Sequence, residues 1–186
     1  MPEKINLNEL EKKAWTTYFE DGFWDIFFGV ILITMGVRSL TDNVWFTFGI
    51  FGAVLINIAG KRFITTPRLG HVKFGSGRQK KQLKIGVMIL ISLLAILVLG
   101  TVMAKTTFPV MAIWLAVFFG LLAYLMDFPR LFAYGLIFAT SEVIWSMFGE
   151  PLGPIADLIF GAIILLVGLA VLTRFLKKYP KPVEGV

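Results

Sequence analysis

Cysteine is absent from the sequence, and histidine occurs once, at His71. A chain without thiols forms neither a disulfide framework nor a thiolate metal site, and a single imidazole is too little for a histidine-based metal centre. We therefore expect no metal and no other cofactor. The segment GSGRQKK contains glycines and basic residues, but its spacing is not that of a phosphate-binding Walker loop.

Charge is also scarce. Only 16% of the 186 residues are charged, against about 25% in an average soluble domain, whereas 57% are hydrophobic. A soluble fold of this length could not bury so much apolar surface, and the same composition excludes a disordered chain or a coiled coil. The sequence therefore predicts a protein of the cell membrane.

The hydrophobic residues are concentrated in six stretches of 17 to 21 residues, which hold only five of the 30 charged residues. At about 1.5 Å per residue, a helix of this length crosses a hydrocarbon core of about 30 Å. Helices are required because lipid offers no hydrogen-bond partner to an open backbone. We therefore predict an all-α, polytopic integral membrane helix bundle with six transmembrane helices. The predicted spans are 23–40, 44–60, 85–104, 110–126, 131–148 and 155–175.

The basic residues predict the orientation of these spans. With the N-terminal segment, loop 61–84, the turn 127–130 and the C-terminal tail on one side, that side carries 16 of the 18 lysines and arginines. By the positive-inside rule, both termini are then cytoplasmic. The net charge of +6 is thus explained by membrane topology, and we expect no nucleic-acid partner.

The two ends of the chain are predicted to lie outside the spans. Residues 6–20, within an N-terminal region 1–22, have the pattern of an amphipathic surface helix, with Trp15 and Tyr18 suited to the headgroup level. This helix is expected to be an in-plane anchor, with a gate or a partner-binding helix as the alternative. Residues 176–186 form a short cytoplasmic tail.

Small residues recur along two of the predicted spans. Gly22, Gly29 and Gly36 are seven residues apart in the first span, and such rows allow helix backbones to approach closely in lipid. A similar row is Ala112, Ala116 and Gly120 in the fourth span. Packing within one bundle is the simplest interpretation, and a homo-oligomer through these helix faces is the alternative. The first span also shares an Asp-x-x-Phe-Gly pattern, followed by a glycine seven residues on, with the last span, where it begins at Asp157.

Ionisable residues within the spans are the candidate functional residues. Glu142 is expected about 9 Å below the outer end of its helix, where a carboxylate is costly and usually faces a bundle interior or a wet cavity. Arg38 and Asp157 are expected in the same half of the membrane, with hydroxyls nearby. The predicted intramembrane polar site is Glu142, Arg38, Asp157, Thr140 and Tyr134. Its role is structural, a proton or cation relay, or catalytic.

Loop 61–84 carries eight basic residues and no acidic residue. Such a loop either marks topology alone or contacts anionic lipid headgroups or another phosphate. The candidate residues for such a contact are Arg68, His71, Lys73, Arg78, Lys80, Lys81 and Lys84.

Three classes of function remain open at this point. The first, which we take as the leading interpretation, is movement of a small solute or ion, or a membrane subunit that supports it. The second is a non-catalytic scaffold or sensor that docks anionic lipid or a cytoplasmic partner through loop 61–84. A membrane enzyme acting on a lipid is the third, and it is disfavoured because acid–base chemistry needs two positioned titratable groups.

Overall fold

The computed structural model describes residues 15–70, 76–103 and 110–181, and within these ranges the chain is helical and contains no strand. A short helix at 15–19 precedes the first long helix. The long elements are α2 (Phe23–Thr41), α3 (Phe48–Gly60), α5 (Ser76–Met103), α6 (Val110–Met126), α7 (Arg130–Phe148) and α8 (Leu152–Lys178). A 3₁₀ turn η1 (Val44–Thr47) precedes α3, and a π-helical stretch η2 (Lys61–Thr65) and a last turn α4 (Thr66–Leu69) follow it.

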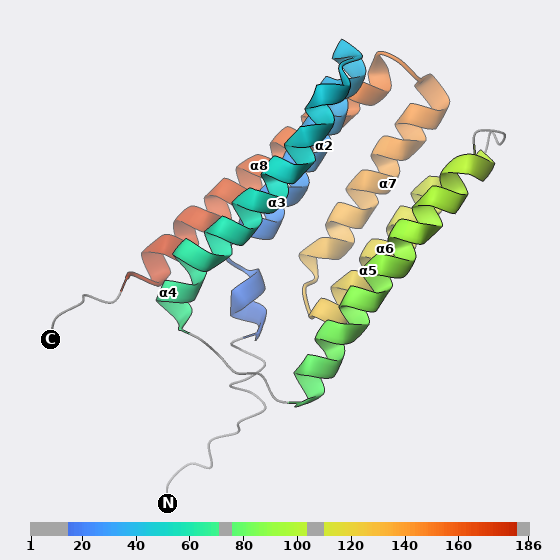
Figure 1. The fold of residues 1–186 in the computed structure, drawn as a ribbon. Helices are drawn as coiled ribbons and strands as arrows, with labels where there is room; N and C mark the ends of the chain where they lie inside the picture. The colour runs from blue at the N-terminus through green and yellow to red at the C-terminus, as the bar shows by residue number, and fades with distance from the viewer. Residues whose placement is uncertain (1–14, 71–75, 104–109, 182–186) are drawn as a thin grey trace, which may run out of the picture.

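These helices lie side by side in two groups. α2 packs most extensively on α8 and also on α3, while α6 packs on α7, and α5 packs against α6 (Figure 1). α7 also contacts α8, so it joins the two groups. The short helix, α4, the start of α5, the turn between α6 and α7, and the end of α8 lie at one end of the bundle (Figure 1). We call this the basic end, because these segments and η2 carry most of the lysines and arginines that the structure describes.

A glycine contact brings the first and last long helices together. A Cβ added at Gly29 would lie 2.9 Å from the carbonyl oxygen of Gly161, and one added at Gly161 would lie 2.9 Å from that of Gly29. Similar close contacts lie on either side of it along the two helices, where Gly168 of α8 meets Ile26 of α2 and Gly36 of α2 meets Leu158 of α8. The Asp-x-x-Phe-Gly pattern shared by the two helices is therefore a packing pattern, in which each helix presents glycines to the other.

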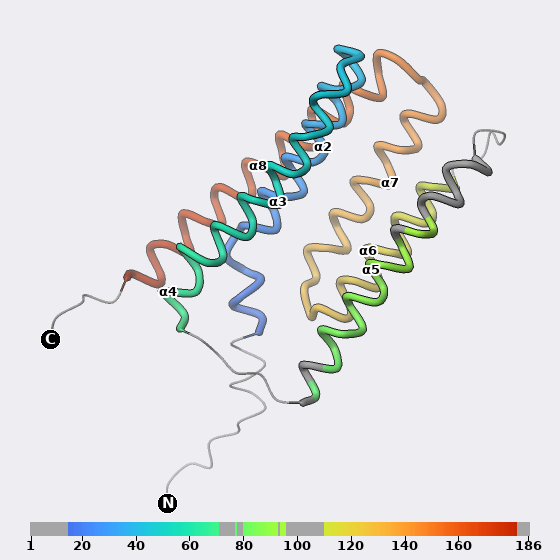
Figure 2. The backbone as a smooth tube through the Cα atoms, in the orientation of Figure 1, coloured from blue at the N-terminus to red at the C-terminus, as the bar shows by residue number. Residues whose placement is uncertain are grey.

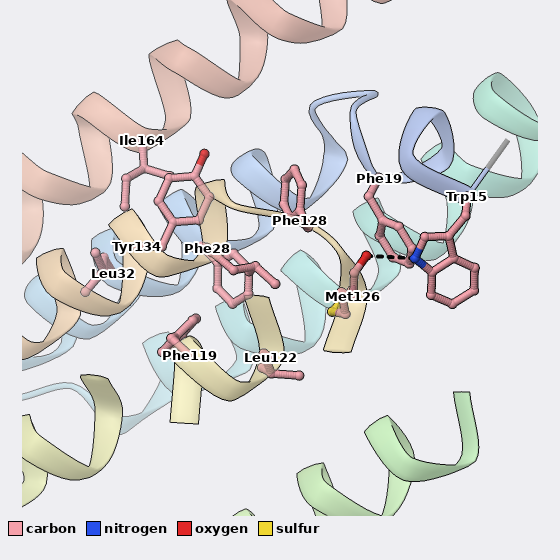
Figure 3. Close-up of a cluster of buried hydrophobic side chains, with 11 residues drawn as sticks. Trp15, Phe19, Phe28, Leu32, Phe119, Leu122, Met126, Phe128, Tyr134 and Ile164 are labelled. Atoms are coloured by element: carbon pink, nitrogen blue, oxygen red, sulfur yellow. Dashed lines mark hydrogen bonds between the residues drawn. The ribbon is translucent and has the colours of Figure 1, made fainter. Parts of the chain in front are cut away.

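Aromatic side chains fill the seam between the two groups. Phe28 of α2 contacts Phe119 of α6 and Tyr134 of α7, with ring centroids 5.2 and 5.9 Å apart. Ile164 of α8 and Leu32 of α2 complete this core (Figure 3), and both are almost fully buried. The seam is thus an apolar interface.

The described part of the N-terminal segment is fastened to this core. Trp15 is only 2% exposed, and its indole N–H donates a 2.7 Å hydrogen bond to the carbonyl oxygen of Met126 at the end of α6 (Figure 3). Phe19 is buried beside it. The prediction placed Trp15 at the lipid headgroup level, whereas the structure buries its ring inside the bundle. Residues 6–14 of the predicted surface helix lie outside the described residues.

The six predicted apolar stretches each fall on a long helix. Among the described residues, four helical segments are long and apolar enough to cross a membrane: Trp15–Thr41, Val44–Leu69, Arg130–Phe148 and Leu152–Lys178. α6 is also apolar but shorter, with 17 residues. An all-helical chain with such helices is compatible with a multi-pass membrane protein.

The predicted loop 61–84 is largely helical. The second long helix continues through η2 and α4 to Leu69, and α5 already begins at Ser76. α5 then runs antiparallel beside α6 (Figure 2). Pro67 occupies the first turn of α4, where a missing backbone N–H does no harm. His71 and Lys73 lie outside the described residues.

Candidate functional site

A buried ion pair joins the turn before α2 to the end of α3. The Nζ atom of Lys61 lies 2.7 Å from Oδ2 of Asp21, and the two side chains are 8% and 0% exposed. Thr65 donates a 2.5 Å hydrogen bond to the same carboxylate, and the backbone N–H of Phe23 donates to its other oxygen over 3.1 Å. Asp21 therefore both accepts a hydrogen bond from the first residue of α2 and holds the lysine.

The π-helical stretch η2 supports this arrangement. Lys61 and Thr65 are its first and last residues, and both are directed at Asp21. The backbone N–H of Thr66 bonds to the carbonyl oxygen of Lys61, which also accepts a 2.8 Å bond from the Thr66 hydroxyl. π-Helical turns are rare and occur frequently at functional sites. Lys61 also donates to the carbonyl oxygen of Tyr18 and lies 4.2 Å from the centroid of its ring.

A second buried carboxylate, Asp25, joins α2 to α7. Arg130 lies 2.9 Å from Oδ2 of Asp25, and the Tyr134 hydroxyl donates to Oδ1. The two donors are four residues apart, so they lie on one face of α7. Asp25 is fully buried, whereas the side chain of Arg130 is 32% exposed and packs on the ring of Phe128. The basic end thus holds a charge-balanced network of two acids and two bases.

The opposite end of α7 has a matching connection to α8. Asp157 is 4% exposed and accepts hydrogen bonds from the Ser141 hydroxyl and from Nε1 of Trp145, the latter over 2.9 Å. These donors are again four residues apart on α7. Two buried aspartates, Asp25 and Asp157, therefore fasten α7 at its two ends to the α2–α8 pair.

The structure distributes the predicted intramembrane residues between these two places. Asp157 lies in the Ser141–Trp145 connection, and Glu142 is the next residue along α7 and is half-buried. Tyr134 bonds to Asp25 at the basic end. Arg38 and Thr140 are exposed, and within the described residues no hydrogen bond or ion pair joins either of them to Glu142.

The predicted basic residues line the same end without forming one cluster. Arg68 is half-buried and donates to the carbonyl oxygen of Ile64 over 2.9 Å. Lys81 pairs with Asp127 at 3.1 Å and so links α5 to the turn after α6. Lys80 and Lys84 are exposed on the first turns of α5, to which Arg78 also belongs.

A hollow of about 780 Å³ opens beside the ion network. Its wall combines polar and basic side chains with apolar ones, and no carboxylate belongs to the wall in the described part of the chain. The polar lining residues are Tyr18, Asn57, Lys61, Arg62 and Thr66, and the apolar ones include Ile58 and Phe63. Arg62 and Phe63 are exposed, and the guanidinium lies 5.8 Å from the Phe63 ring centroid. The hollow therefore combines an exposed cation with an apolar rim.

Sequence reasoning missed Asp21 and Lys61, which it treated as solvated charges flanking the spans. A signal was present at both positions. Asp21 lies two residues before one apolar stretch, and Lys61 directly follows another. Their pairing over 40 residues needs the fold to bring α2 and η2 together.

Comparison of the chain with protein-family models, with curated proteins and with solved structures gave no match. Among the described residues, no group of three or more histidine, aspartate or glutamate side chains is arranged to hold a metal ion. The function is therefore argued from the network and the hollow alone.

Proposed function

We propose that this chain crosses the membrane six times, with both termini in the cytoplasm. The proposal is supported by the gathering of the basic segments at one end of the bundle (Figure 1). Arg62, Arg68, Lys80, Arg130 and Lys177 all belong to segments at this end. Positive charge next to apolar helices marks the cytoplasmic side. Arg38 is at the other end of α2 and is an exception to this pattern.

The proposed function is that of a non-catalytic membrane scaffold or sensor that docks an anionic lipid headgroup at its basic end. The observation that carries this proposal is the hollow beside Lys61 and Arg62. The phosphate of a lipid headgroup needs a cation, and the acyl chains of the lipid need apolar surface. The wall of the hollow offers both. Lys61 is already neutralised by Asp21, so Arg62 supplies the charge that the ligand meets.

The other buried charges support a fixed frame around such a ligand. Asp25 and Asp157 are each satisfied by two donors, and the seam between the helix groups is filled by aromatic rings. Buried charges that are paired and hydrogen-bonded resist rearrangement, because removal of one partner leaves the other uncompensated. This architecture favours a stable docking frame.

Lipid retention by the purified protein tests this function. Native mass spectrometry is run with added phosphatidylglycerol or phosphatidylcholine on the wild type and on Arg62→Gln. We expect the wild type to retain phosphatidylglycerol preferentially and Arg62→Gln to lose about fivefold in that preference, since one basic residue near anionic lipid contributes about 1 kcal/mol.

Arg38→Gln is the matched control, because Arg38 is an exposed arginine at the opposite end of α2. It should retain the wild-type preference. Equal retention of both lipids by the wild type would contradict headgroup docking at the hollow. So would an equal loss of the preference for phosphatidylglycerol in the two variants.

Movement of a small cation or proton is a second candidate, which is favoured by one observation. The half-buried Glu142 directly follows Ser141, whose hydroxyl donates to the buried Asp157 of α8. We expect Glu142→Gln to remain folded and to abolish ion flux in proteoliposomes if this glutamate carries the ion. Unchanged flux in the variant, or no flux in the wild type above that of empty vesicles, would leave Glu142 a structural residue.

A further inference from the structure

A second hollow lies between α5 and α6, on helices that do not line the first. Its volume is about 400 Å³. On α5 it extends from Leu83 to Ser92, and on α6 from Trp114 to Leu121. The lining is apolar apart from Lys84 near one end and Ser92 at the other. It is therefore a lateral groove with one charged end.

The length of the groove corresponds to one leaflet of a bilayer. Nine residue steps from Leu83 to Ser92 span about 13 Å at about 1.5 Å per residue, and half of a hydrocarbon core of about 30 Å is about 15 Å. The charged end lies on the first turns of α5, which are at the basic end of the bundle (Figure 1). The groove thus starts near the membrane surface and ends near the middle of the bilayer.

The groove is long and narrow. A volume of about 400 Å³ spread over about 13 Å gives a mean cross-section of about 30 Å². A single extended hydrocarbon chain is narrow enough. Leu83, Val87 and Ile91 on α5 and Val117 on α6 offer it apolar contacts along the whole length.

The charged end identifies the headgroup. Lys84 and Lys80 are exposed one turn apart, and neither forms an ion pair in the part of the chain that the structure describes. Lys81, between them, is held by Asp127. The ammonium group of Lys84 at the end of the apolar groove, with that of Lys80 one turn away on α5, attracts an anionic headgroup in preference to a zwitterionic one.

We propose that the α5–α6 groove binds one acyl chain of an anionic phospholipid, whose phosphate lies against Lys84. The proposal rests on the membrane placement given under Proposed function, but it uses none of the residues of the first hollow. It adds a lipid site to the outermost helix pair of the bundle.

Trp114 provides the test, because it lines the deep end of the groove. The protein is reconstituted in bilayers with lipids brominated near the middle of the chain, which quench nearby tryptophan. Subtraction of the signal of Trp114→Phe isolates this indole from the other four. We expect brominated phosphatidylglycerol to compete for the site about fivefold better than brominated phosphatidylcholine.

The variants decide between this groove and general attraction to the basic end. Lys84→Gln should abolish the preference, whereas Lys177→Gln, an exposed lysine on α8, and Arg62→Gln, at the first hollow, should keep it. No preference in the wild type, or the same loss in Lys84→Gln and Lys177→Gln, would overturn the proposal. The two proposals can also be separated. If Trp114 shows the preference for phosphatidylglycerol but Arg62→Gln does not change lipid retention, headgroup docking at the first hollow is contradicted and lipid binding in the groove is supported.

Discussion

At the scale of single residues, three buried aspartates in the described part of the chain each interact with two donor side chains. Asp21 has Lys61 and Thr65, Asp25 has Arg130 and Tyr134, and Asp157 has Ser141 and Trp145. In each case the two donors are four residues apart in the sequence. Only Asp21 and Asp25 have a cation as partner, and a buried ion pair is costly to form in a low-dielectric interior but still costlier to break on one side.

Removal of Asp21 alone should therefore be more damaging than removal of the pair. We expect Asp21→Asn to lower the free energy of unfolding by about 3–5 kcal/mol, because Lys61 is left charged and buried. Asp21→Asn combined with Lys61→Met should recover much of that loss. Unfolding by a strong detergent in mixed micelles measures both variants.

Lys81→Gln is the control, since the Lys81–Asp127 pair has side chains 40% and 30% exposed. Its effect should stay below about 1 kcal/mol, as for other surface pairs. A double variant that is no more stable than Asp21→Asn would show that Lys61 contributes something other than compensation of the carboxylate.

At the scale of the elements, the sequence predicted what depends on local pattern. Long apolar runs placed six helices, and glycines seven residues apart indicated close packing. It could not predict partners that are remote in the chain. Tyr134 bonds to Asp25 over 109 residues, and this pair forms only because α7 crosses the basic end beside α2. From its expected depth in the membrane, the Tyr134 hydroxyl was predicted beside Glu142, whereas it lies beside Asp25. Lys61 was predicted in solvent because its helix was expected to end at residue 60.

Replacement of glycine by alanine should have opposite effects on stability at Gly29, which is in the glycine contact, and at Gly52, which is not. A Cβ at Gly29 would meet the backbone nitrogen of Leu165 at 2.7 Å, so Gly29→Ala must push α2 and α8 apart and should cost about 1–3 kcal/mol. A Cβ at Gly52 of α3 meets no atom within 4 Å, so Gly52→Ala should be neutral or stabilise the helix by up to about 1 kcal/mol. Unfolding in mixed micelles measures the difference, and equal effects would contradict close packing at Gly29.

At the scale of the whole molecule, the proposed topology makes a prediction that needs little engineering. The chain has no cysteine, so each introduced thiol is the only one present. A membrane-impermeant maleimide added to intact cells should label Glu150→Cys, in the turn between α7 and α8, and should label Lys80→Cys only after the cells are opened. Both positions are exposed. Labelling of both from the same side would contradict six spans with cytoplasmic ends.

The pairing of α2 with α8 has a consequence for synthesis. Ribosomes deliver the chain from its N-terminus, so in the proposed topology α2 enters the bilayer long before α8 is made. Until α8 is inserted, Gly29 and Gly36 face lipid or a helper protein. Until α7 is inserted, Asp25 lacks its partners Arg130 and Tyr134. The bundle is therefore complete only when α8, its last helix, packs on α2. A chain that stops after Glu150 should contain most of the helices and still be recognised as incomplete by the proteases of the cell.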